Sequence, residues 1–387
     1  MLRFSTRLLA LWVACFLLPA PGFAQDAAGA PVPEDRDGNV YEDVDELLVG
    51  ARVHALWMVR DKHGKPANEF RMNTVRLRLK WRASEMVEAA LEADVADAFG
   101  GTAETQVSPF LRDAYVRLEP LKLLNVQMGQ FKKPFSRIEL RSKGKLETIL
   151  RGVSNEFLVQ DLLYGERDIG IMVDGRIGGR KKGGRYFVGA FNGTGKNAKE
   201  QDVNGVKDIV ARIEADPWKW LSLGTNVSVK LSDPSDELLR PESAWLAGAD
   251  ARLRLGDLLI IAEGLFGQGV DESCVSDDMY ALYKCASDKK YDSPPTAWSA
   301  LLLTSYRIQL TEGAGALMLE PVLKAEMLNP NTDVDSGAVV GLTPAVNLHI
   351  GKHTRIMADG ELLFAQDHTY ARFDDDKRFL LQLAFDL

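Results

Sequence analysis

The sequence predicts an all-β protein, a transmembrane antiparallel β-barrel of about 16 strands. Three observations support this fold class. Apolar and polar residues alternate with a period of two in many segments of about ten residues, with little helical periodicity between them. The connections between these segments are short and long in turn, which is typical of outer-membrane barrels. Several tryptophans fall near segment ends, where the two membrane interfaces would lie.

The N-terminal residues predict an exported protein. Arg3 and Arg7 precede an apolar run over residues 8–18, and small residues up to Ala24 offer a cleavage site, so residues 1–24 are predicted to be a signal peptide. The run is far shorter than the roughly 20 apolar residues of a membrane-spanning helix. A lipoprotein anchored at Cys15 is disfavoured because apolar residues follow that cysteine.

Residues 25–49 are predicted to form an acidic periplasmic leader, and residues 50–387 the barrel domain. Within the leader, "DRDGNVYEDVDE" places oxygen-bearing side chains at the spacing of a calcium-binding loop. Val40 occupies the position where such a loop needs glycine for its sharp turn. No metal site is therefore predicted there.

Sixteen segments with period-two alternation are predicted to be strands. In chain order they are Ala51–Arg60, Arg71–Arg82, Glu85–Ala96, Leu111–Leu118, Leu123–Phe131, Asp168–Ile177, Arg185–Phe191, Lys207–Ala215, Leu221–Leu231, Trp245–Leu255, Leu258–Gly267, Ala297–Leu310, Leu317–Leu328, Val339–Ile350, Thr354–Ala365 and Arg378–Leu387.

The second segment, "NTVRLRLKWRA", shows the alternation most clearly. From residue 75 to residue 82, one parity carries only apolar side chains, and the other carries Arg76, Arg78, Lys80 and Arg82. In a barrel the apolar parity faces lipid and the basic parity faces the lumen. A soluble sandwich would have to bury the apolar face against a second sheet, which accounts for this strand but not for sixteen of them.

The tryptophans agree with two aromatic belts. Trp81, Trp218 and Trp220 fall at segment ends that lead into short turns, whereas Trp245 and Trp298 follow long loops. Tryptophan is enriched at both membrane–water interfaces. The long loops are therefore predicted on the extracellular side and the short turns on the periplasmic side.

Composition excludes several other classes of protein. The formal charge of −8 would become −10 on removal of Arg3 and Arg7, which argues against a nucleic-acid partner. Cys274 and Cys285 are candidates for one disulfide, since an exported chain can oxidise such a pair. The five histidines have no local serine or aspartate signature of a catalytic site, so we expect neither an enzyme nor a cofactor.

The stretch "LRDAYVRLEPLKLLNVQMGQFKKPFSRIELRSKGKLE" resembles the phosphate-selective porin O/P family. Members carry a similar Asp-Ala-Tyr strand, here residues 113–115, followed by Gly-Gln-Phe-Lys-x-Pro-Phe-Ser, here residues 129–136. "GERDIGIMVDG" and "YFVGAFNGTG" are similar to further blocks of the family, so the resemblance spans about residues 111–195. It implies a sixteen-stranded, trimeric outer-membrane porin that passes anions, with a long third loop folded into the lumen.

The longest connection between predicted strands, residues 132–167, is the candidate for this loop. It concentrates basic residues, with a local balance of +5 over residues 132–151. Inside a pore these cations would attract anions and repel cations, because low-dielectric walls focus the field. A solvated loop that never enters the lumen is the alternative. The predicted pore-lining or anion-binding residues are Arg76, Arg78, Lys80, Arg82, Lys132, Lys133, Arg137, Arg141, Lys143 and Lys145.

Glu88, Glu92 and Asp94 on the third predicted strand weigh against a strict anion filter. They are expected beside the basic parity of the second strand and could form ion pairs with it. The sequence thus predicts an outer-membrane channel for passive diffusion of small anions, phosphate or polyphosphate, as a homotrimer among lipid and lipopolysaccharide. A weakly selective porin, and a plugged barrel with a structural or adhesive role, are the alternatives.

Overall fold

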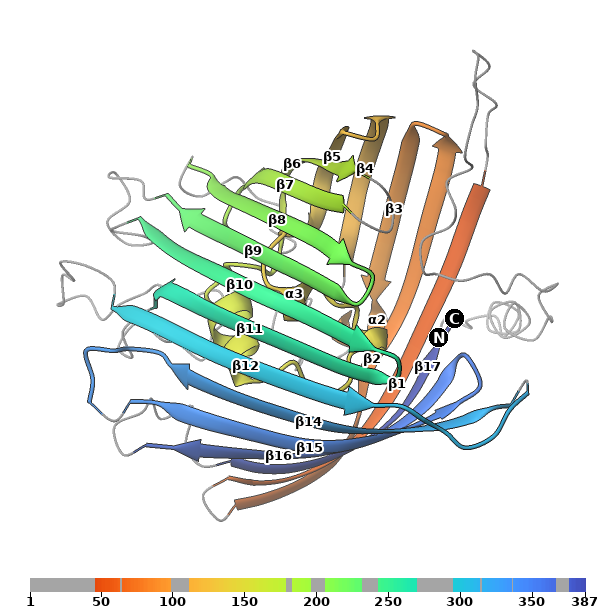
Figure 1. Ribbon diagram of the computed structural model, residues 1–387, viewed down its shortest axis with the longest axis vertical. Helices are drawn as coiled ribbons and strands as arrows, with labels where there is room; N and C mark the ends of the chain where they lie inside the picture. The colour runs from red at the N-terminus through yellow and green to blue at the C-terminus, as the bar shows by residue number, and fades with distance from the viewer. Residues whose placement is uncertain are drawn as a thin grey trace, which may run out of the picture. The chain divides into compact units, whose positions relative to one another are not determined.

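The computed structural model is a closed antiparallel barrel (Figure 1). Its strands are β1 (Glu46–Lys62), β2 (Lys65–Ser84), β3 (Val87–Asp94), β4 (Leu111–Leu121), β5 (Leu124–Lys132), β6 (Arg167–Gly178), β7 (Gly183–Phe191), β8 (Asp208–Trp218), β9 (Leu221–Lys230), β10 (Ala244–Leu255), β11 (Leu258–Gln268), β12 (Thr296–Tyr306), β13 (Ile308–Gln309), β14 (Leu317–Asn329), β15 (Val339–Ile350), β16 (Thr354–Ala365) and β17 (Asp376–Asp386). Because β12 and β13 follow one another and both pair with β14, the barrel has sixteen strand positions.

The structure describes residues 46–62, 65–98, 111–178, 183–195, 206–231, 243–269, 295–313, 315–335, 337–366 and 376–387. All of them belong to one compact unit, Glu42–Leu387. The predicted signal peptide, residues 25–45 of the predicted leader, and the candidate disulfide between Cys274 and Cys285 lie outside the described residues.

The first and last strands close the ring. β1 pairs with β17 from Arg52 opposite Asp386 to Lys62 opposite Asp376, and with β2 along its whole length. Within the described residues, each of the sixteen strand positions therefore has two neighbours, and none presents an unpaired edge. This closure is what a sheet requires to cross a bilayer, where water cannot satisfy exposed peptide groups.

The described part of the chain also contains four short helical segments: α2 (Val95–Ala98), α3 (Arg137–Leu140), the 3₁₀-helix η1 (Lys143–Lys145) and the π-helix η2 (Asn155–Asp161). Within the described residues, no helix is both long enough and apolar enough to cross a bilayer.

The predicted strands agree with the observed ones apart from their ends. The third strand ends at Asp94, two residues before its predicted end at Ala96, because Val95 begins α2. The predicted strand over residues 297–310 is interrupted at Arg307. β1 begins at Glu46 and β2 at Lys65, both earlier than predicted. A bulge between His54 and Ala55 shifts the β1–β2 register there, so the alternation visible from Thr74 onward does not continue before it.

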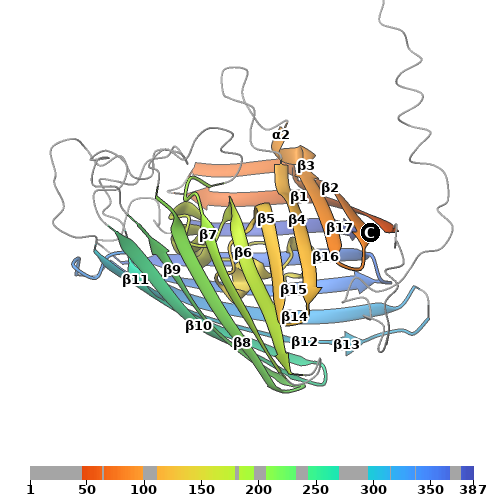
Figure 2. The same ribbon diagram turned by 90° about the horizontal axis from the view of Figure 1, so that it is seen from above.

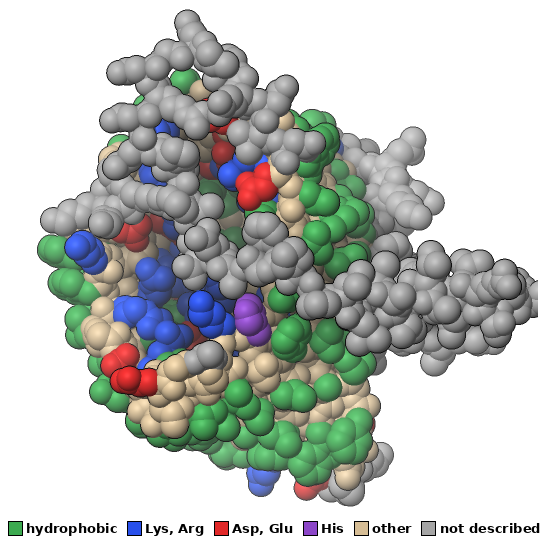
Figure 3. Space-filling model, turned by 90° about the vertical axis from the view of Figure 1, so that its right-hand side faces the viewer, with side chains coloured by type: hydrophobic (Ala, Val, Ile, Leu, Met, Phe, Trp, Pro, Cys, Tyr) green, Lys and Arg blue, Asp and Glu red, His purple; other side chains and the backbone are tan. Residues whose placement is uncertain are grey.

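Alternation places apolar side chains on the outside of the barrel and charged ones inside. Leu77 and Trp81 on β2 are each 48 % exposed, whereas Arg76 on the same strand is buried. Figure 3 shows an apolar outer surface around a group of Lys and Arg side chains in the interior. The prediction of a lipid-facing and a lumen-facing parity is confirmed.

Aromatic residues at the strand ends pack against one another in pairs. Trp218 and Trp220, which flank the short β8–β9 turn, stack with ring centroids 5.1 Å apart. At the long-loop ends of β10 and β11, Trp245 packs on Phe266 at 5.9 Å. Amphipathic rings of this kind suit the headgroup level of a bilayer.

The third loop, residues 133–166, folds into the lumen (Figure 2). Its Phe135, Phe157, Leu158 and Tyr164 are fully buried in a cluster with wall residues. The wall side of this cluster comes from several strands around the ring: Phe191, Val210, Leu246, Leu265, Ala297, Leu328, Val339 and Leu363. The apolar cluster inside the barrel is thus shared between the loop and the wall.

Candidate functional site in the lumen

The third loop is fixed at its root by a buried lysine. Lys133 Nζ lies 2.9 Å from Asp208 Oδ2 and 3.2 Å from Asp168 Oδ2, and it donates a hydrogen bond to the carbonyl of Leu163. Its side chain is fully buried. The sequence predicts Lys133 as a pore-lining cation. Because its ammonium is buried between two carboxylates, Lys133 instead anchors the loop to the wall.

The start of α3 is attached to β11 and β10. Ser136, at a positive φ of 60°, donates through Oγ to Glu263 at 2.8 Å, and the backbone N–H of Arg137 donates to the same carboxylate at 2.5 Å. The Arg137 guanidinium reaches Asp250 on β10 at 2.5 Å. Asp250 also pairs with the buried Arg212 at 2.7 Å, so the charge of Arg137 is shared within a network.

The middle of the loop is bonded to strands on another part of the wall. The N–H of Ile149 donates to Asp359 on β16 at 2.6 Å, and the N–H of Ser154 donates to Glu326 on β14 at 3.0 Å. In the opposite sense, Asn347 on β15 donates to the carbonyl of Glu147 at 2.8 Å. Because both kinds of peptide group are satisfied by wall side chains, the irregular loop backbone is stable inside the barrel.

Glu139 forms ion pairs with two of the remaining cations, Lys132 and Arg151. It lies 2.6 Å from Lys132 Nζ and 3.3 Å from Arg151 Nε, and it accepts a hydrogen bond from Gln160 at 2.7 Å. Burial by itself raises the pKa of Glu139, but Arg151 and Lys132 together lower it below its ordinary value. Arg141 forms a separate pair with Glu147. The charges of Lys132 and Arg141 are thus each balanced by a carboxylate a few residues away in the sequence.

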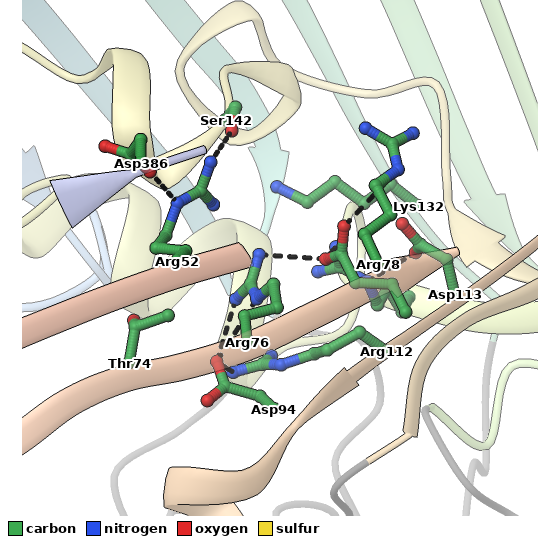
Figure 4. Close-up of polar contacts among 12 residues, drawn as sticks. Arg52, Thr74, Arg76, Arg78, Asp94, Arg112, Asp113, Lys132, Ser142 and Asp386 are labelled. Carbon is green, nitrogen blue, oxygen red and sulfur yellow. Dashed lines mark hydrogen bonds and ion pairs between the residues drawn. The ribbon is translucent and has the colours of Figure 1, made fainter. Parts of the chain in front are cut away.

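The wall strand β2 carries the basic residues that the sequence pointed out, and the neighbouring β3 carries their counter-charges. In the strand register Arg76 faces Asp94, Arg78 faces Glu92 and Arg82 faces Glu88. Arg76 lies 2.9 Å from Glu92 and 3.0 Å from Asp94 (Figure 4). The ion pairing expected from Glu88, Glu92 and Asp94 is therefore present.

The other three basic residues of β2 are paired less tightly. Lys80 and Arg82 share Glu88, at 2.7 and 3.3 Å. Arg78 lies 3.8 Å from a carboxylate oxygen of Glu92, and its side chain is 49 % exposed. Arg78 is therefore the guanidinium of this basic parity with the greatest access to solvent.

The tip of the loop, Ser142–Lys145, brings a further cation to this wall. Among the residues that the structure describes, the Lys143 ammonium has no ion pair or hydrogen bond, while Arg112 and Arg76 are the charged groups that act on it most strongly. Burial, and then these two guanidinium groups, lower the pKa of Lys143 to about 7. Lys145 is exposed nearby. The tip thus places one lysine beside two arginines.

Arg112 and Arg52 belong to this site but were not predicted. A register shift between Glu92 and Ala93 places Arg112 in a bulge of β4, and its guanidinium lies 3.8 Å from Asp94. Arg52 on β1 donates to Ser142 Oγ at 3.0 Å and pairs with Asp386 (Figure 4). Local alternation could not reveal either residue, because Arg112 lies in a bulge and Arg52 pairs with a residue almost the whole chain away.

Comparison with known proteins agrees with this geometry. Residues 50–235 match the model of the family described as phosphate-selective porin O and P. The chain belongs to this family. It is an outer-membrane porin channel, and not an enzyme. Among the residues that the structure describes, no group of three or more His, Cys, Asp or Glu side chains could hold a metal ion.

Solved porins share the fold of this porin at low sequence identity. The anion-selective porin from Comamonas acidovorans is 12 % identical, with a TM-score of 0.60, over 89 % of this chain and 100 % of that one. The outer-membrane channel DcaP of Acinetobacter baumannii is 14 % identical, with a TM-score of 0.57, over 88 % and 97 %. The trimer form of OmpT from Vibrio cholerae is 8 % identical, with a TM-score of 0.56, over 89 % and 100 %. No curated protein sequence matches the chain.

Proposed function

We propose that this porin passes small oxyanions, phosphate or polyphosphate among them, by passive diffusion past a basic constriction formed by the tip of the third loop and the β2 wall. The observation that carries the proposal is the Lys143 ammonium, which forms no ion pair among the described residues and on which the Arg112 and Arg76 guanidinium groups act more strongly than the Asp94 carboxylate. An anion entering this space would meet three cations from two sides of the lumen.

The chemistry of these side chains suits oxyanions. A guanidinium presents parallel N–H donors that match two oxygens of a phosphate, and an ammonium adds a point charge. Asp94 and Glu92 already occupy part of the Arg76 guanidinium, so the site would hold an anion only weakly. Weak binding is what a channel needs, because a solute that binds too tightly does not leave.

The proposal is tested by the zero-current potential across a planar bilayer that contains the purified porin, under a KCl gradient and again with phosphate. We expect a potential of the anion-selective sign and block of the chloride current by millimolar phosphate. Lys143→Gln should move the potential toward zero, whereas the control Lys219→Gln, in the exposed turn between β8 and β9, should not. An equal response of both variants, or no conductance at all, would refute the proposal.

A weakly selective porin is the second candidate. The ion pairs of Arg76, Lys80 and Arg82 with Asp94, Glu92 and Glu88 favour it, since paired charges brace the wall instead of attracting solutes. It predicts a zero-current potential near zero in the wild type. That result would rule out selectivity for phosphate but would not contradict the porin fold.

We further propose that the mature chain, after removal of residues 1–24, is a homotrimer in contact with lipopolysaccharide. The trimer form of the structurally similar OmpT supports this assembly. Native mass spectrometry in detergent gives the number of chains directly, and N-terminal sequencing gives the cleavage site. A monomeric mass, or an N-terminus at Met1, would contradict the respective part.

A further inference from the structure

The barrel seam, where β1 meets β17, lies directly against the tip of the third loop. At one end of the seam, two backbone hydrogen bonds extend the β1–β17 ladder, from Ala51 N–H to the Leu387 carbonyl at 3.2 Å and from Leu387 N–H to the Ala51 carbonyl at 2.8 Å. In the next residue pair of the register, Arg52 faces Asp386, and their side chains form an ion pair. His54, fully buried, lies 3.4 Å from the same carboxylate.

One guanidinium joins the seam to the loop. Arg52 directs Nε to Asp386 and Nη2 to Ser142 Oγ, the latter at 3.0 Å (Figure 4). The carboxylate fixes the plane of the guanidinium, and the planar group then fixes where the serine hydroxyl must lie. The contact therefore depends on Asp386 although Asp386 itself does not bond to Ser142.

The loop backbone at residue 144 also lies close against the side chains of the seam. A Cβ added to Gly144 would be 2.7 Å from Arg52 Nη2 and would overlap Asp386 Oδ1. On the other side of this residue, Arg355 of β16 donates to the carbonyl of Gly144 at 3.3 Å and to that of Leu146 at 2.7 Å. We call Arg52, Asp386 and Arg355 the seam anchor.

Lys143 lies between Ser142, which is bonded to Arg52, and Gly144, whose carbonyl is bonded to Arg355. Its surroundings are unfavourable for a cation, because Arg76 and Arg112 repel it and the site is partly removed from water. A tip that was free to move would carry this ammonium away from the two guanidinium groups and into solvent. A restraint on both sides of Lys143 is thus needed to keep it there.

We propose that the seam anchor positions the loop tip, and that Arg52 is the positioning residue that keeps Lys143 beside Arg76 and Arg112. The same ion pair then bridges the two strands of the seam and holds the tip that completes the basic constriction. The effect on ion selectivity rests on the proposed function. The effect on the position of the tip does not, and the experiment measures the tip.

The test uses Lys143→Cys in the full-length porin in which Cys274 and Cys285 are replaced by serine. The quantity measured is the ratio of the rates at which an anionic and a cationic methanethiosulfonate reagent modify the thiol introduced at position 143. Beside Arg76 and Arg112 this ratio should favour the anionic reagent. Arg52→Ala should lower it several-fold, and Arg52→Lys should restore part of the loss.

Asp386→Asn separates positioning from simple charge. It removes a negative charge, so electrostatics alone would raise the ratio, whereas loss of the seam anchor would lower it. A control, Arg117→Gln, removes a cation that bonds to Glu119, Gln127 and Asp174 on the wall strands, and it should leave the ratio near its starting value.

The outcomes are distinct. A raised ratio in Asp386→Asn overturns the inference. Should that variant fail to assemble, Ser142→Ala decides, because it removes the loop side of the contact and leaves the seam intact: a lowered ratio supports the inference and an unchanged one overturns it. If Lys143→Gln leaves selectivity unchanged while these ratios fall as expected, the proposed function is wrong and the seam anchor stands.

Discussion

At the scale of single residues, the cations of the third loop differ in what holds their charge. Lys133, Arg137 and Arg151 are each bonded to carboxylates or carbonyls and fasten the loop. Lys143 has no such partner among the described residues, and Arg112 and Arg76 act on its charge more strongly than the Asp94 carboxylate does. A paired cation is already neutralised and attracts a passing anion weakly, whereas a cation among cations attracts it strongly. The residue with the least favourable surroundings is therefore the one best suited to select anions.

The pKa of about 7 at Lys143 predicts pH-dependent selectivity. Below that pH the side chain carries its proton and a positive charge; above it the charge is lost, so anion selectivity should fall as the pH rises through about 7. Zero-current potentials between about pH 6 and pH 8.5 measure this. Lys143→Arg should remain selective throughout, because arginine stays protonated.

Glu156 in the same loop needs separate consideration. Burial, and then the charge of Glu361, raise the pKa of Glu156 to about 7. Its ionisation above that pH adds a negative charge and lowers anion selectivity in the same direction. The difference between the wild type and Lys143→Arg is therefore the part due to Lys143. Identical pH profiles for the two would show that Lys143 does not set the selectivity.

The sequence could show that this loop is basic but not which of its cations are paired. The partners of Lys133 and Arg137 are Asp208 and Asp250, which lie 75 and 113 residues away in the chain. Such pairs form only when the loop packs into the closed barrel. Composition therefore predicted a basic loop, and the partner of each cation depends on the fold.

At the scale of elements, strands were predictable because their two faces meet different solvents. Lipid outside and polar groups inside impose period-two alternation on every strand, and this pattern is visible in the sequence. It fails where a bulge inserts a residue, as at Asn73 of β2 opposite His54 and Ala55, and it carries no information about irregular segments such as η2. The cross-strand pairs of β2 and β3 followed from alternation and adjacency alone.

These pairs predict that removal of a wall carboxylate strengthens anion selectivity. Glu88 holds Lys80 and Arg82, whose side chains are 29 % and 35 % exposed. In Glu88→Gln both cations keep water contact and lose their counter-charge, so the zero-current potential should move further in the anion-selective direction. The control Glu312→Gln makes the same charge change in an exposed turn. A shift toward cations in Glu88→Gln would contradict this account.

The outer face of the same strand predicts a loss of stability. Leu77 is four residues from Trp81, about 13 Å along the strand, which places it well inside the apolar band. Leu77→Arg should lower the free energy of unfolding in lipid vesicles by about 2 kcal/mol or more. Denaturant titration measures this, with Leu77→Ile as the control. An unaffected unfolding midpoint in Leu77→Arg would mean that this parity does not face lipid.

At the scale of the whole molecule, the barrel wall and the third loop inside it are held in place by different interactions. The barrel is held by a closed ladder of backbone hydrogen bonds, from β1 through β17 and back to β1. The third loop is held by side chains: carboxylates of the wall that accept from its N–H groups, and an apolar cluster around Phe157 and Leu158. Since the ladder contains no loop residues, closure of the ring should not require the loop.

This separation predicts that the barrel survives removal of the loop. Lys133 bonds to the Leu163 carbonyl, so the two ends of the loop lie close together and a short Gly-Ser linker can replace residues 136–161. The exposed wall carboxylates would then be hydrated. The variant should still migrate as a folded barrel in an unheated detergent gel, conduct more ions per channel, and lose the pH dependence due to Lys143. Failure to fold, with a folded Lys143→Gln beside it, would show instead that the loop's apolar cluster is needed to close the ring.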